Sequence, residues 1–152
     1  MMKKFFVLFF TLFSVASLMA QTTNPVSWSF TTKKINEKEY EVQLVATMQK
    51  GWHVYSQNQP KEAIAIPTSF SFNKNPLVDL DGKVKEVGKL EKFNDPVLDV
   101  AAFQYSDKVV FVQKVKLKGK VKTRLTGKLE FQACTDEKCL PPKSVDFAIP
   151  IS

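Results

Sequence analysis

Two cysteines, Cys134 and Cys139, are the residues of this chain best suited to covalent chemistry. They are its only cysteines, four residues separate them, and the prolines Pro141 and Pro142 follow. A β-like run leads into Cys134, and a tight loop between paired strands would bring the two residues together. In most disulfides the Cα atoms lie roughly 4.4–6.8 Å apart, and such a loop brings two residues about that close. The spacing therefore predicts an intramolecular disulfide at the tip of a hairpin.

The predicted disulfide has two interpretations, a structural cross-link or a reactive pair. Closing so short a loop stabilises a fold by roughly 2 kcal/mol, against about 4.7 kcal/mol for a loop of 100 residues. In exchange chemistry one cysteine attacks, or is attacked, and the other resolves the mixed disulfide. The positive charges of Lys138 and Lys143 favour a thiolate, whereas Asp136 and Glu137 oppose it. The spacing alone leaves both interpretations open.

Metal binding and hydrolysis are the competing uses of such residues. The only histidine, His53, lies far upstream of the cysteines. A blue-copper site needs two histidines and a cysteine, usually with a methionine, and a site of two cysteines and His53 would need an outside ligand. His53 stands between Trp52 and Val54, which favours a packed histidine over a catalytic one. We therefore expect no metal and no cofactor.

The first 20 residues have the order of a secretory signal peptide. Lys3 and Lys4 precede an apolar run over residues 5–13, and small residues are frequent in 14–20. A membrane anchor is the alternative, but the run is shorter than the roughly 20 residues needed to span a bilayer. We expect cleavage near Ala20, no membrane insertion afterwards, and a periplasmic or otherwise exported protein. Disulfides persist in such oxidising compartments.

The expected mature chain, residues 21–152, carries 20 basic and 15 acidic residues, a net charge of +5. The excess lies in residues 108–128, where lysines alternate with apolar residues. Nucleic-acid binding is one interpretation of such a stripe. The alternation favours a solvated strand face, where lysine also guards a sheet edge against pairing. We therefore expect no nucleic-acid partner.

Period-two hydrophobicity dominates the chain after residue 26, as in half-buried strands. Turn residues such as Asp81–Gly82 and Lys118–Gly119 separate the segments, and no sustained helical period follows the leader. These features predict an all-β protein, an antiparallel β-sandwich with one domain over 21–152. Residues 83–107 are the least regular part, and loops often carry function. The alternating segments are 28–30, 40–48, 70–72, 109–117, 125–133 and 145–151.

The cysteine motif resembles that of a known family. Residues 131–134 read Phe-Gln-Ala-Cys, and Cys139 is followed by Leu-Pro-Pro. This pattern is similar to the N-terminal periplasmic domain of the thiol:disulfide interchange protein DsbD. Upstream, residues 51–57 (Gly-Trp-His-Val-Tyr-Ser-Gln) resemble the family's Gly-aromatic-x-x-Tyr strand, and 111–115 fit the strand before the cysteine hairpin. The resemblance covers most of residues 26–152.

This resemblance implies an immunoglobulin-like sandwich with the cysteines on an end hairpin. It assigns mixed-disulfide formation to Cys139 and resolution to Cys134. It also implies a cap loop over the disulfide, with Phe93 in residues 91–95 as the shielding aromatic. Tyr55, and less directly His53, are expected near the cysteines. Anchoring of the loop to the sandwich is the alternative role for Phe93.

The implied function is electron transfer by thiol–disulfide exchange between a DsbD-type membrane reductase module and thioredoxin-like exported oxidoreductases. The loop between the cysteines is one residue shorter than in the enterobacterial form of the domain. The membrane domain and the thioredoxin-like domain of the family do not follow, so we expect a monomeric redox carrier and not a complete reductase. The alternative is an immunoglobulin-like binding module with a structural disulfide. A reduction potential below about −300 mV would favour that alternative.

Overall fold

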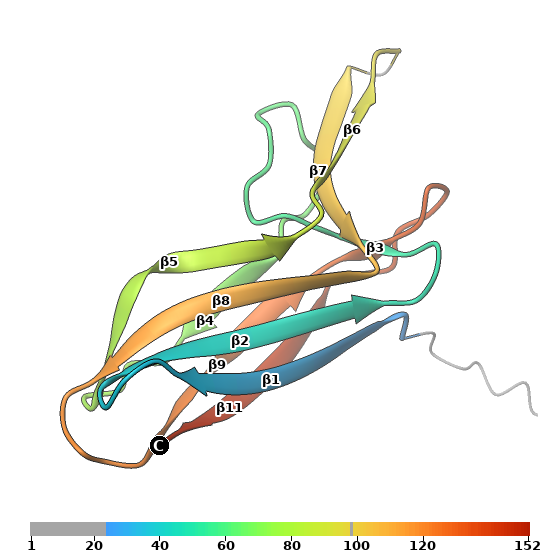
Figure 1. The fold of residues 1–152 in the computed structure, drawn as a ribbon. Coiled ribbons are helices and arrows are strands. Elements are labelled where there is room, and N and C mark those ends of the chain that lie inside the picture. The colour runs from blue at the N-terminus through green and yellow to red at the C-terminus, as the bar shows by residue number, and fades with distance from the viewer. Residues whose placement is uncertain (1–23, 98) are drawn as a thin grey trace, which may run out of the picture.

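The computed structural model describes residues 24–97 and 99–152 as strands joined by turns and loops (Figure 1). The expected signal peptide, residues 1–20, lies outside the described residues. Within the described ranges, no helix is long and apolar enough to cross a membrane. The strands are β1 (Val26–Lys34), β2 (Glu39–Met48), β3 (His53–Tyr55), β4 (Ser69–Phe72), β5 (Val78–Gly88), β6 (Glu91–Asp95), β7 (Val100–Ser106), β8 (Lys108–Leu117), β9 (Thr123–Phe131), β10 (Ala133–Cys134) and β11 (Lys143–Ile151).

Two antiparallel sheets form an immunoglobulin-like β-sandwich, which confirms the predicted fold class. One sheet has the order β1-β2-β8-β5 and the other has the order β11-β9-β4. The alternating segments of the sequence correspond to β1, β2, β4, β8, β9 and β11. Along each of these strands, buried or half-buried side chains alternate with more exposed ones, because successive residues of a strand point to opposite faces of a sheet.

Aromatic side chains fill part of the space between the two sheets. The Trp28 ring, from β1, lies 5.8 Å from the Phe111 ring on β8 and 5.4 Å from the Phe131 ring on β9. Phe70 on β4 lies 4.9 Å from Phe111. Rings from both sheets therefore interlock, and tilted or edge contacts of this kind contribute beyond their buried area.

The lysines of β8 lie on a solvated strand face, as the alternation predicts. Lys114 and Lys116 are exposed, whereas Val115 between them is buried. The Lys116 Nζ atom lies 3.3 Å from a Glu39 carboxylate oxygen and 3.5 Å from one of Asp81. The expected role in guarding a sheet edge is wrong for this strand, because β8 lies between β2 and β5.

The segment expected to be irregular, residues 83–107, consists mainly of strands. It holds the end of β5 together with β6 and β7. The predicted turn at Asp81–Gly82 lies inside β5, where the pairing with β8 shifts register between Asp81 and Lys85. Gly82 has φ 72° at this bulge, a conformation that glycine adopts readily. The hydrophobic pattern of the sequence does not reveal these strands, because β5 and β6 are largely exposed on both faces.

A third antiparallel sheet, of order β10-β3-β7-β6, extends one end of the sandwich. Gln132 alone separates β9 from β10, and Asp107 alone separates β7 from β8. Strands of both sandwich sheets therefore continue into this third sheet. The β6–β7 hairpin projects beyond the sandwich, and the loop between β3 and β4 rises beside it (Figure 1).

Gly127 provides a test of the packing in the smaller sheet. It pairs with Phe72 of β4 on one side and Phe147 of β11 on the other, and these two rings lie 5.6 Å apart. A Cβ atom at Gly127 would meet the Ser71 carbonyl oxygen and would lie 2.6 Å from Phe147 Cζ.

We therefore predict that Gly127→Ala lowers the free energy of unfolding by about 1–3 kcal/mol, the usual cost of overpacking. Gly119→Ala is the control, because nothing lies within 4 Å of a Cβ atom there. Urea denaturation of both variants provides the measurement. Equal stability of the two variants would contradict the packing described.

Candidate functional site

The cysteine hairpin is closed by a compact set of hydrogen bonds. The Thr135 amide donates to the Lys138 carbonyl oxygen (2.7 Å), and the Leu140 amide donates to that of Ala133 (2.9 Å). Thr135 Oγ1 accepts from the Lys138 amide at 3.2 Å. At the base, Gln132 Nε2 donates to the Leu140 carbonyl oxygen at 3.1 Å. The sequence therefore folds as the predicted hairpin, with residues 135–138 as its turn.

A disulfide joins Cys134 and Cys139 across this hairpin, with their Cα atoms 4.0 Å apart. The two residues form an isolated antiparallel bridge. Their surroundings differ sharply, because Cys134 is 0% exposed in β10 whereas Cys139 is exposed beyond the turn. One sulfur-bearing residue is therefore accessible to another molecule and the other is enclosed by the fold.

Cys139 borders a hollow of about 480 Å³ at the junction of three segments. One wall comes from the loop between β3 and β4, and another from β6 and β7. The turn between the cysteines provides the third wall. The lining residues are His53, Tyr55, Ile64, Ala65, Ile66, Phe93, Val100, Ala101, Ala102, Gln104, Gln132, Thr135, Asp136, Glu137, Lys138 and Cys139.

Strand β3 brings Tyr55 and His53 to the disulfide. The Tyr55 hydroxyl oxygen lies 3.9 Å from Cys139 Sγ. His53 pairs with Cys134 in the β10–β3 register, and its ring lies 5.4 Å from that of Tyr55. His53 is 6% exposed, and this burial lowers its pKa although the charges of Asp136 and Glu91 act in the opposite direction. Burial also raises the pKa of Tyr55. Both side chains are therefore uncharged near neutral pH.

Phe93 lines the same hollow as Cys139 and is 50% exposed. The segment expected to be a cap loop, residues 91–95, is strand β6, paired with β7 along its whole length. Glu91 accepts a hydrogen bond from Ser106 Oγ at 2.9 Å, which ties this hairpin to its base. Phe93 is thus carried on a paired strand at the edge of the third sheet.

Sequence reasoning missed one wall of the hollow. Ile64 and Ile66 lie in the loop between β3 and β4 and border the hollow. The available signal was a short alternation, Ile64-Ala65-Ile66, next to a proline and outside any long strand pattern. Such a segment has no feature that separates a surface loop from a short strand.

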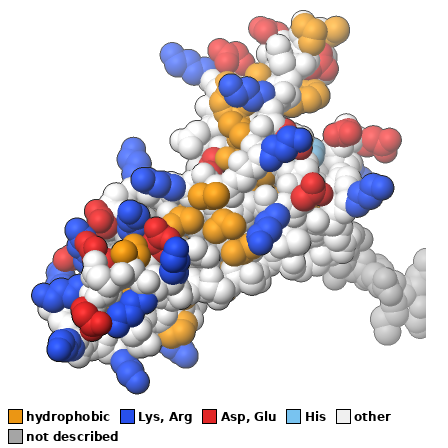
Figure 2. All heavy atoms as spheres, in the orientation of Figure 1, with side chains coloured by type: hydrophobic (Ala, Val, Ile, Leu, Met, Phe, Trp, Pro, Cys, Tyr) orange, Lys and Arg blue, Asp and Glu red, His pale blue; other side chains and the backbone are white. Residues whose placement is uncertain are grey.

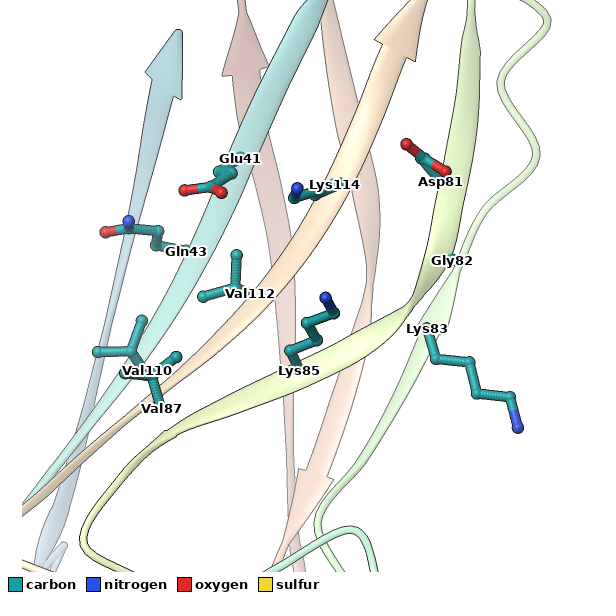
Figure 3. Close-up of a pocket in the computed structure, with 10 residues that line it drawn as sticks. All are labelled: Glu41, Gln43, Asp81, Gly82, Lys83, Lys85, Val87, Val110, Val112 and Lys114. Atoms are coloured by element: carbon teal, nitrogen blue, oxygen red, sulfur yellow. The ribbon is translucent and has the colours of Figure 1, made fainter. Parts of the chain in front are cut away.

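A larger hollow, of about 610 Å³, lies on the outer face of the first sheet. Val87, Val110 and Val112 lie together in it, with Lys114 and Glu41 beyond them (Figure 3). No cysteine or histidine lines it. The smaller hollow is lined by Cys139 and His53, and it is therefore the candidate functional site. Across residues 24–97 and 99–152, no group of three or more His, Cys, Asp or Glu side chains is placed to hold a metal ion.

Comparisons with known proteins agree with this geometry. Residues 20–150 match the family described as "Thiol:disulfide interchange protein DsbD, N-terminal". The chain therefore belongs to the DsbD N-terminal domain family, a family of thiol–disulfide exchange domains, and the cysteine pair of such a domain is present. None of the curated proteins matches the chain significantly.

Similar solved structures include the N-terminal periplasmic domain of ScsB from Proteus mirabilis. That match has 14% identity and a TM-score of 0.57, and covers 88% of this chain and 49% of the other. The chain thus spans about half the length of that structure, and the likeness concerns the fold. The Neisseria meningitidis DsbD N-terminal domain in its reduced form matches with 14% identity and a TM-score of 0.48, over 79% of this chain and 82% of the other. The yeast GGA1 GAE domain matches with 6% identity and the same TM-score, over 86% and 96%.

The buried His53 predicts a pH dependence of stability. Because the pKa of His53 is lower in the folded protein than its usual value of 6.5, the unfolded chain binds more protons at mildly acidic pH. Its contribution to stability is present above about pH 6.5 and is lost as the pH falls from there through the folded pKa. We expect the free energy of unfolding of the oxidised protein to fall less in His53→Gln than in wild type between about pH 7.5 and pH 5. Equal losses, measured by urea denaturation, would show that His53 titrates normally.

Proposed function

We propose that this protein is an exported carrier of electrons that reacts through the Cys134–Cys139 dithiol and disulfide. The observation that carries the proposal is the contrast between an exposed Cys139 and a fully buried Cys134. Exchange needs one accessible sulfur to meet the partner and a second sulfur within reach to release it. A disulfide with only a structural role has no need of an exposed member on an open hollow.

The proposed reaction begins with the reduced dithiol. The Cys139 thiolate attacks one sulfur of a partner disulfide, forms a mixed disulfide and expels the partner's other sulfur as a thiolate. Cys134, after losing its proton to solvent, attacks Cys139 Sγ and releases the second partner sulfur. The partner gains two electrons, and the Cys134–Cys139 disulfide is formed. A protein dithiol, as the electron donor, restores the reduced state by the reverse sequence.

The residues around the hollow have distinct proposed roles. The Tyr55 hydroxyl group, 3.9 Å from Cys139 Sγ, can donate a weak hydrogen bond to the sulfur as charge develops on it. His53 packs against Cys134 and limits access of water to the buried sulfur. Phe93 serves as a partial shield, because its ring lines the hollow without being buried in the sandwich.

Family membership supplies the proposed partners and location. For a DsbD N-terminal domain these are thioredoxin-like exported oxidoreductases and a DsbD-type membrane reductase module. The leader-like residues 1–20 support export to the periplasm, and residues 21–152 form the proposed mature domain, acting as a monomer.

Cysteine substitution tests the proposal. In Cys134→Ala, no resolving thiol remains, so mixed disulfides with partners should accumulate on Cys139. We expect thiol-dependent adducts on non-reducing gels after expression in a cell that exports the protein, and far fewer adducts in Cys139→Ala. Loss of the bands on reduction is the control for a disulfide link.

Equal trapping by the two cysteine variants would contradict the assignment of Cys139 as the attacking residue. Failure of both variants to trap any protein would favour the alternative, a binding module with a structural disulfide. Both variants lack the bridge, so the comparison is matched for the loss of about 2 kcal/mol that the cross-link supplies.

A shielding role for Phe93 predicts a kinetic effect without a stability effect. In Phe93→Ala, dithiothreitol should reduce the disulfide several-fold faster because access to the sulfur limits the rate. The free energy of unfolding should change by less than about 1 kcal/mol, since Phe93 is half exposed. Leu80→Ala, at a similarly exposed position on β5, is the control. Unchanged kinetics with a clear loss of stability would identify Phe93 as an anchor of the hairpin.

A further inference from the structure

Large apolar side chains are unusually exposed beside the disulfide. Ile64 is 85% exposed and Ile66 is 41% exposed in the loop between β3 and β4. Phe93, on β6 of the β6–β7 hairpin, is 50% exposed. Figure 2 shows hydrophobic side chains along this projecting hairpin, with charged side chains among them. Exposed apolar groups gathered in one place indicate a contact surface more often than scattered ones do.

The loop between β3 and β4 is anchored at its ends and exposed in its middle. Gln59 exchanges two hydrogen bonds with the Phe103 backbone, donating to its carbonyl oxygen (2.6 Å) and accepting from its amide (3.0 Å). At the other end, Thr68 Oγ1 donates to the Tyr55 carbonyl oxygen at 2.6 Å. These bonds fix the loop beside the third sheet, so that Ile64 and Ile66 stand at the hollow and remain accessible.

The turn between the cysteines adds charged residues to the lining of the hollow. Asp136, Glu137 and Lys138 lie in the turn that leads to Cys139, and all three are exposed. A molecule that enters the hollow therefore meets both apolar and charged side chains in its lining, together with Cys139. The volume of about 480 Å³ is in the range of pockets, about 300–1,000 Å³, that hold drug-sized ligands. It can hold a few side chains of a protein loop.

We propose that Ile64, Ile66 and Phe93 form a recognition surface for a protein partner whose reactive cysteine is flanked by apolar side chains. The inference rests on the proposed exchange at Cys139. A partner sulfur must come within about 2.05 Å of Cys139 Sγ to form the mixed disulfide. The residues around that sulfur must then occupy the hollow, where burial against the two isoleucines stabilises apolar neighbours.

Two synthetic peptides test this preference with the reduced wild-type protein. Each peptide has one cysteine, joined as a mixed disulfide to thionitrobenzoate. At the second residue before the cysteine and the second residue after it, one peptide has leucine and the other has serine. The Cys139 thiolate attacks the peptide sulfur, the bond to thionitrobenzoate breaks, and the coloured thiolate leaves. Cys134 then releases the peptide thiol and closes the disulfide, so that the dithiol loses the two electrons that the mixed disulfide gains.

The initial rate of colour release measures attack by Cys139. To correct for the intrinsic reactivity of each peptide, the rate of the protein with that peptide is divided by the rate of free glutathione with the same peptide. We expect the leucine peptide to react about five-fold faster or more with wild type, since burial of an apolar side chain supplies the difference. The double variant Ile64→Ser with Ile66→Ser should lose most of this preference. The single variant Ile64→Ser should lose part of it, and at 85% exposure that residue is not needed for folding.

Ile35→Ser is the matched control. Ile35 is 47% exposed in the turn between β1 and β2, at the other end of the sandwich (Figure 1). It should keep the full preference, and all variants should react equally with the mixed disulfide of glutathione and thionitrobenzoate. Equal rates of the two peptides with wild type, or an unchanged preference in both isoleucine variants, would overturn the inference while leaving exchange at Cys139 intact. Absence of reaction with every probe would overturn the proposed function itself.

Discussion

Strand β10 pairs with β3 through two residue pairs, Ala133 with Val54 and Cys134 with His53. This short stretch of pairing determines how exposed each of the two cysteines is. It continues β9 out of the sandwich and buries Cys134, whereas Cys139 forms only an isolated bridge to Cys134, beyond the edge strand β10 of the sheet. The difference in exposure between two sulfurs joined by one bond therefore follows from where the sheet ends.

The walls of the hollow depend on a second interaction, centred on the Glu86 carboxylate of β5. It accepts hydrogen bonds from Ser56 Oγ (2.7 Å), the Gln57 amide (2.6 Å) and the Tyr105 hydroxyl group (2.8 Å). Burial, together with the bond to Glu86, raises the pKa of Tyr105. One charged group of the sandwich thus holds both the start of the β3–β4 loop and strand β7. Hydrogen bonds to an ionised acceptor are stronger than neutral ones, which suits a group that positions two segments bordering the hollow.

Most of the sandwich and the cysteine hairpin were predictable from the sequence. Strands such as β2 and β9 bury one face, so their alternation is visible in the residues. The third sheet was not predictable, because its edge strand β6 is largely exposed on both faces and its strands β3 and β10 have only three and two residues, too few to show an alternating pattern. The family resemblance identified Phe93 as a candidate, but it did not predict that this residue lies in a strand. Ile64 and Ile66 could not be predicted as site residues. Their position at the hollow depends on hydrogen bonds of Gln59 and Thr68 to residues distant in the sequence, which no local pattern reveals.

The asymmetry of the pair also constrains the chemistry of the proposed exchange. When a thiolate attacks Cys139, Cys134 must leave as a thiolate in a site with 0% exposure, and burial disfavours the charged form. Lys138, whose Nζ atom lies 5.9 Å from the centre of the Trp52 ring, belongs to the exposed turn. His53, next to Cys134 in register, is itself kept neutral by burial. His53 therefore offers no positive charge to compensate for charge on Cys134. A buried leaving group slows indiscriminate reduction by small thiols, and a partner that fills the hollow gains binding energy that can offset this cost. Under the proposed assignment, the burial that gives Cys134 the resolving role also favours protein partners over small thiols.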